Sequence, residues 1–142
     1  MTSAAVAVTT AMTFVWLGMV LAISFLEAPL KFGAPGVTLP IGLGIGRRVF
    51  RALNAVEAVL AVGIVVALLV DAPGTGATVA LAVAIVVLAA QLVLVRPRLN
   101  ERSDAVLAGH EGPRSHAHLW YVGTESVKVV ALLVGGILAL AG

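Results

Sequence analysis

Three charged side chains that interrupt apolar stretches of the chain are its best candidates for chemistry: Glu57, Glu125 and Lys128. An ionised group inside membrane hydrocarbon costs at least about 2.5–3.5 kcal/mol, so such groups are expected to pair with one another or to serve a function. The last apolar stretch carries His118, Tyr121, Glu125 and Lys128 at alternating intervals of three and four residues. This spacing places them on one stripe of a helix.

Polar residues of two other apolar stretches extend this pattern. Asn54 lies three residues before Glu57, and Glu27 ends the first stretch three residues after Ser24. Polar stripes of a membrane bundle should face each other, so we expect one polar cluster near one membrane surface and an entirely apolar half beyond it. We predict that eight residues form a ligand- or ion-binding site there: Glu27, Arg51, Asn54, Glu57, His118, Tyr121, Glu125 and Lys128.

Metal binding stays open at this stage. Imidazole and carboxylate groups suit zinc, iron and manganese, which makes His118, Glu125 and Glu57 the candidate ligands. No HExxH or ExxH motif lies on an apolar stretch, and the sequence indicates neither a particular cofactor nor a catalytic residue. The chain has no cysteine, which excludes disulfides and thiolate metal sites.

The composition indicates which elements position these residues. Of the 142 residues, 61% are hydrophobic and only 11% are charged, whereas a soluble domain has about 25% charged residues. Four apolar runs approach the roughly 20 residues that a helix needs to cross a membrane. We therefore predict one domain, an all-α integral membrane four-helix bundle with spans at about 4–27, 48–70, 77–96 and 116–141.

Turn and cap residues mark the expected boundaries of these spans. The segment 71–76 contains Pro and two Gly and predicts a tight turn, while Pro97 predicts the end of the third helix. Ser115 is the expected N-cap of the fourth helix. The glycine-rich segment 38–46 has three possible interpretations: an interfacial segment, a re-entrant segment, or an early start of the second helix.

The basic residues predict how the chain is oriented. Eight of the nine fall in two predicted loops, whereas the termini and the turn at 71–76 have no Lys or Arg. The positive-inside rule places both loops in the cytoplasm and both termini outside, in a bacterial-type inner (plasma) membrane. The lipid bilayer is then the main partner, and no continuous basic patch is left for nucleic acid.

Two further features concern the ends and the halves of the chain. The first span lacks the basic start and the cleavage site of a signal peptide, so we expect it to be retained. Each half of the chain reads span, basic loop, span, which indicates a possible parallel repeat.

Three segments together resemble a known family. Ser24-Phe-Leu-Glu-Ala-Pro29, Arg96-Pro-Arg-Leu-Asn100 and His118 at the start of the last span are similar to features of the bacterial four-helix membrane family related to transmembrane protein 205. The resemblance covers most of the chain. It implies the four-helix fold and says little about mechanism.

A second resemblance is local. Arg51-Ala-Leu-Asn54-Ala-Val-Glu57 is similar to the helix-two motif of the membrane-associated eicosanoid and glutathione enzymes, although there the Arg and Asn are four residues apart rather than three. This resemblance implies a trimeric, glutathione-dependent transferase. Arg51, Asn54, Glu57 and Tyr121 would then bind glutathione and stabilise its thiolate.

Three hypotheses therefore remain for the polar cluster. The first is a small multi-pass protein whose cluster, in the cytoplasmic half of the membrane, binds or conducts a small ligand, a proton or a cation. The second is the glutathione-dependent transferase, so the sequence leaves open whether the chain is an enzyme. The third is mutual neutralisation of the charges, which would only fix the register of the helices. In each case we expect a dimer or trimer, because the mostly apolar third span leaves a wide face for another copy.

Overall fold

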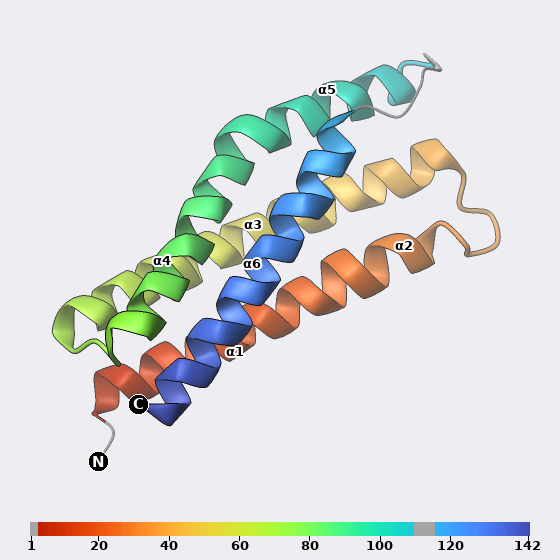
Figure 1. Ribbon diagram of the computed structural model, residues 1–142. Helices are drawn as coiled ribbons and strands as arrows, with labels where there is room; N and C mark the ends of the chain where they lie inside the picture. Colours follow the sequence, from red (N-terminus) through yellow and green to blue (C-terminus); the bar gives the residue numbers. More distant parts are fainter. Residues whose placement is uncertain (1–2, 110–115) are drawn as a thin grey trace.

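The computed structural model describes residues 3–109 and 116–142, and within them all regular structure is helical. Four long helical rods lie alongside one another, with both termini at one end of the bundle and α2 and α5 at the other (Figure 1). The elements are α1 (Ala4–Val20), η1 (Leu21–Glu27), α2 (Ala28–Lys31), α3 (Leu39–Val70), α4 (Thr75–Ala90), η2 (Gln91–Val95), α5 (Arg96–Leu107) and α6 (His116–Ala141). Four helices in the described residues are long and apolar enough to cross a membrane, as the sequence predicts.

The glycine-rich segment 38–46 is the start of α3. Thr38 accepts a hydrogen bond from the backbone N–H of Ile41 at 3.4 Å, and Pro40 occupies the first turn, where its missing N–H costs nothing. Gly42 is buried because the ring of Phe32 occupies the space where a Cβ would lie. The helix that contains the second predicted span therefore begins at Leu39, nine residues before that span, which is the third of the three interpretations of this segment.

Two helical rods contain a wide turn directly before a proline. The N–H of Ala28 bonds the carbonyl of Ile23, and the N–H of Arg96 bonds the carbonyl of Gln91, five residues back in each case. Proline lacks the N–H of a regular turn and its ring crowds the preceding turn, and a π-helical turn accommodates both effects. The chain thus continues as helix past Pro29 and Pro97.

The prediction that Pro97 ends the third helix is therefore wrong. The helix runs on to Leu107, so much of the two predicted basic loops is helical. Lys31 lies on α2, Arg47, Arg48 and Arg51 on α3, and Arg96, Arg98 and Arg102 on α5. The predicted cap at Ser115 and the basic residue Arg114 lie outside the described residues.

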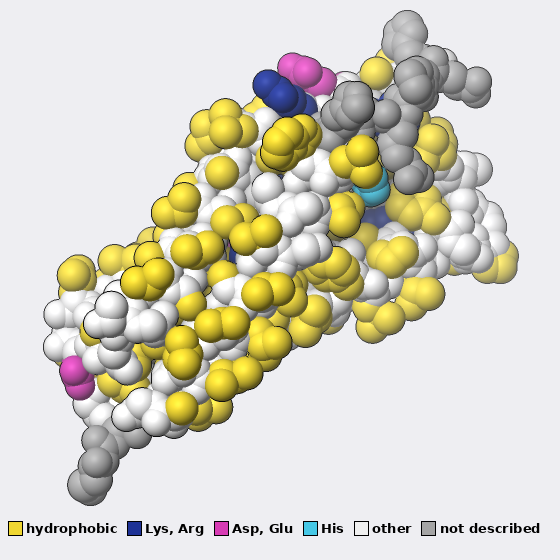
Figure 2. Space-filling model, viewed as in Figure 1, with side chains coloured by type: hydrophobic (Ala, Val, Ile, Leu, Met, Phe, Trp, Pro, Cys, Tyr) yellow, Lys and Arg dark blue, Asp and Glu magenta, His cyan; other side chains and the backbone are white. Residues whose placement is uncertain are grey.

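Most of the interior of the bundle is apolar, and so is most of its surface. Trp16, Ile64, Leu81 and Leu132 are fully buried in one core cluster, whereas outward side chains such as Leu69 are largely exposed. On the face seen in Figure 2, hydrophobic side chains run along the whole bundle and the visible acidic groups lie at its two ends. An apolar surface of this extent suits lipid rather than water.

The two halves of the described chain correspond at a fixed interval. Pro97 follows Pro29 by 68 residues, and Glu125 follows Glu57 by the same 68. The same interval relates the two π-helical hydrogen bonds to each other. Buried positions match as well, including Val20 with Leu88 and Ile64 with Leu132. These correspondences support the parallel repeat.

Candidate functional site

The centre of the site is the ammonium group of Lys128, which is completely buried between two carboxylates. Its Nζ lies 2.5 Å from Oε2 of Glu57 on α3 and 2.6 Å from Oε1 of Glu125 one turn earlier on α6. Each of the three side chains is only 1% exposed. Nζ also donates a hydrogen bond to Oε1 of Gln91 at 2.8 Å. The expected contact of both carboxylates with Lys128 is thus present in the structure.

Glu57 forms the apolar side of this network. The indole Nε1–H of Trp16, on α1, donates to the same Oε2 that contacts Lys128, at 2.7 Å. The second oxygen, Oε1, is buried and has no hydrogen-bond partner among the described residues. A buried carboxylate oxygen without a donor is costly, because an ionised group keeps the full penalty for losing water.

Glu125 forms the polar side of the network. Its Oε2 accepts hydrogen bonds from the hydroxyl of Ser24 at 2.7 Å and from the phenol of Tyr121. The amide nitrogen of Gln91 lies 3.4 Å from its Oε1. Ser24 belongs to η1 and Gln91 opens η2, so both π-helical turns contribute side chains to the network. Such turns recur at functional sites in other proteins.

An aromatic and cationic rim covers the network at the end of the bundle that carries α2 and α5. The ring of Tyr121 meets the ring of Phe50 edge to face, with centroids 5.5 Å apart. The guanidinium of Arg96 lies over both rings, at 5.0 Å from the centroid of Phe50 and 5.2 Å from that of Tyr121. Ser24 and Tyr121 are half-buried, so the network comes nearest to the surface here.

Beyond Glu57, toward the termini, the interior is closed by apolar side chains. Ile64, Leu81 and Leu132 are each fully buried there. The sequence leads us to expect an entirely apolar half, and that expectation is wrong in one respect, because Thr9 and Thr13 are fully buried on α1. The hydroxyl of Thr13 bonds the carbonyl of Thr9 at 2.7 Å, which keeps it within its own helix.

The structure brings together half of the eight predicted site residues. Glu57, Tyr121, Glu125 and Lys128 share the network. Of the other four, Glu27 is 38% exposed and faces Lys31 at 3.6 Å, Arg51 is exposed, and Asn54 and His118 are half-buried. Arg51 and Glu57 thus point to different surroundings, although the predicted glutathione site needs both.

Three further side chains of the network are absent from that predicted set. Ser24 and Gln91 are visible in the sequence as polar residues of apolar spans, but neither carries a charge that demands a partner. Trp16 resembles an ordinary core residue, and only the packing of α1 against α3 brings its N–H to Glu57. Trp16 lies three residues after Thr13 and seven after Thr9, and this spacing is the one feature of the sequence that places it on a polar helix face.

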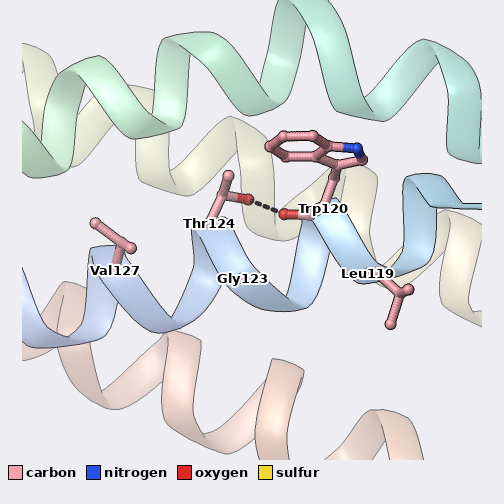
Figure 3. A pocket seen from close by; sticks show the side chains of 5 residues that line it. All are labelled: Leu119, Trp120, Gly123, Thr124 and Val127. Carbon is pink, nitrogen blue, oxygen red and sulfur yellow. Dashed lines mark hydrogen bonds between the residues drawn. The ribbon is translucent and has the colours of Figure 1, made fainter.

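Among the residues whose side chains the structure describes, 3–109 and 118–142, no three His, Cys, Asp or Glu form a group that could hold a metal ion. Glu57, Glu125 and His118 do not form the metal site that the sequence left open. A shallow depression on α6 is lined by Leu119, Trp120, Gly123, Thr124 and Val127 (Figure 3). The Thr124 hydroxyl accepts a hydrogen bond from Gln91 at 3.0 Å, which links this depression to the network through neutral groups.

The comparisons with known proteins add no relative. No protein-family model matches the chain, and neither the curated proteins nor the solved structures gave a match. The two resemblances drawn from the sequence therefore stay predictions.

Proposed function

We propose that this chain is a plasma-membrane protein whose buried network binds a proton taken from the cytoplasm. The proposal rests on one observation, that a single ammonium, Lys128, is shared by two carboxylates, Glu57 and Glu125, with all three side chains 1% exposed. One positive charge cannot neutralise two negative ones. A further proton on one carboxyl group makes the network neutral, which is what an apolar environment favours.

Glu57 is the carboxyl group that we assign to the proton. Its Oε1 has no hydrogen-bond donor, whereas Oε2 of Glu125 is contacted by two hydroxyl donors, those of Ser24 and Tyr121. Donors of this kind stabilise an ionised carboxylate. The unmatched oxygen of Glu57 is instead the position where a bound proton removes the largest desolvation cost.

The orientation follows from the positions of the basic residues. Lys31, Arg47, Arg96 and Arg98 belong to the end that carries α2 and α5, while the termini and the 71–74 turn have no Lys or Arg. We therefore assign the α2 and α5 end to the cytoplasm and the termini to the outside. The half-buried rim at Tyr121 is then the cytoplasmic entrance for the proton, and the core around Leu81 closes the path to the outside.

Infrared spectroscopy of the protein in liposomes tests this function. We expect a neutral carboxyl C=O band at neutral pH that is lost in Glu57→Gln and kept in Asp104→Asn, the control at a carboxylate that is 62% exposed. Absence of the band in the wild type would refute the proposal. Loss of the band in Glu125→Gln but not in Glu57→Gln would refute the assignment to Glu57.

The contacts of Glu57 and Tyr121 and the exposure of Arg51 do not favour the glutathione-dependent transferase. Of its four predicted groups, Glu57 is held by Lys128 and Trp16, and Tyr121 by Glu125, while Arg51 is exposed. Calorimetry with glutathione on the purified protein separates the two functions. The transferase should bind glutathione with a measurable heat, whereas the proposed proton site should show none.

A further inference from the structure

Arg96 has an unusual environment for a cation at the edge of a membrane span. Its guanidinium is half-buried against the rings of Phe50 and Tyr121, and its Nε is buried without a hydrogen-bond partner. No carboxylate of the described residues lies within ion-pair distance of it, although Glu125 is bonded to the neighbouring Tyr121. Ring contacts cover the faces of a guanidinium and leave its N–H edge free for an acceptor.

A second cation shares the same aromatic ring. Nζ of Lys31 lies 5.8 Å from the centroid of Phe50, and the side chain is only 10% exposed. Gly46 makes room for it, because a Cβ at that position would lie 2.9 Å from Nζ. The nearest acid, Glu27, is 3.6 Å away and 38% exposed, so one carboxylate faces the two cations of this rim.

The depth of Arg96 identifies the kind of anion that reaches it. The 16 residues of α4 and the 5 of η2 contain no charged side chain, and Arg96 directly follows them. At about 1.5 Å per residue, this apolar segment is about 31 Å long, which matches the roughly 30 Å of membrane hydrocarbon. The guanidinium therefore lies where the hydrocarbon ends and the phosphates of lipid headgroups begin.

We infer that Arg96 and Lys31 form a binding site for the phosphate of an anionic lipid headgroup. A phosphodiester offers two oxygens in the geometry that the free edge of Arg96 can bind with two parallel hydrogen bonds. Lys31 adds a second positive charge at the same ring, which favours headgroups with net negative charge over zwitterionic ones. The site adjoins the Lys128 network at Tyr121, but it does not depend on the proton assigned to Glu57.

Lipid retention tests the site. The protein is reconstituted in nanodiscs of equal parts phosphatidylcholine and phosphatidylglycerol, extracted in mild detergent, and its bound lipids are counted by native mass spectrometry. We expect phosphatidylglycerol to be enriched on the wild type and the enrichment to fall about fivefold in Arg96→Gln, which is about 1 kcal/mol. Arg98→Gln is the matched control, since Arg98 is exposed on the same helix, and it should keep the enrichment.

Each other result overturns the inference. Equal retention of both lipids by the wild type excludes headgroup selectivity. This measurement uses the wild type alone and does not depend on whether a variant folds. If inorganic phosphate displaces the lipid and raises the thermal stability of the protein, the site binds a free anion and not a lipid headgroup. A selectivity unchanged in Arg96→Gln, together with an altered carboxyl band of the network, would mean that Arg96 balances the charge of Glu125 instead. Circular dichroism melts of each variant establish that it is folded.

Discussion

Replacing Lys128 by Met removes the only cation from a network with two carboxylates. Methionine keeps most of the apolar stem of the lysine, so the packing around α6 changes little while both ion pairs, at 2.5 and 2.6 Å, are lost. Removing one partner of a buried ion pair typically costs about 3–5 kcal/mol. Glu125 would then be an unpaired buried charge and Glu57, neutral in the proposed function, would lose a hydrogen-bond donor, so we expect a loss of unfolding free energy within that range.

The assay is chemical unfolding of Lys128→Met in detergent at neutral pH, compared with the wild type. The variant should regain stability as the pH falls, because protons neutralise the carboxylates that Lys128 no longer pairs. The triple variant with Glu57→Gln and Glu125→Gln should also recover most of the loss, since no buried charge remains. A loss below about 1 kcal/mol, the size expected for exposed ion pairs, would show that the network is solvated and refute the reasoning.

Four other predictions concern the network, the orientation and the oligomer. Trp16→Phe keeps the ring and removes the donor to Glu57, so unfolding in detergent should show a loss of about 1–3 kcal/mol, and no loss would mean that the bond is not formed. Glu125→Gln should fold, with a cost of about 1–3 kcal/mol in the same assay, because its amide oxygen still accepts from Ser24 and Tyr121. Reporter fusions should place residues 98–112 in the cytoplasm and both termini outside, and a cytoplasmic C-terminal reporter would contradict the orientation. Native mass spectrometry in mild detergent should detect a dimer or trimer, and a monomer alone would count against the expected oligomer.

The charged part of the site could be predicted from the sequence because charge in an apolar segment demands a partner. The three- and four-residue spacing of Tyr121, Glu125 and Lys128 puts them on one stripe, and Glu57 is the only carboxylate well inside another span. The cost of burying these groups leaves few arrangements other than mutual contact. Glu27 and Arg51 need no partner in the network, because Glu27 lies at the end of its span beside Lys31 and Arg51 is exposed.

The neutral part of the site could not be predicted, because its residues have no such demand. A tryptophan, a glutamine or a serine in a membrane helix is acceptable in several environments, so Trp16, Gln91 and Ser24 gain a role only from tertiary packing. The continuation of the helices past the prolines could not be predicted either, because it depends on local backbone geometry. Pro97 is a typical stop signal, and only the wider turn at Gln91 shows that the helix continues.

The 68-residue correspondence explains why the network has two carboxylates and one ammonium. Glu57 and Glu125 occupy equivalent positions of the two halves, and each is buried in the same interior. The position equivalent to Lys128 is Leu60, a residue that packs against the apolar core. A parallel repeat with Glu at both positions would bring two carboxylates together without a counter-charge. A lysine in only one half neutralises one of them and leaves the other, Glu57 in our proposal, for a proton to neutralise.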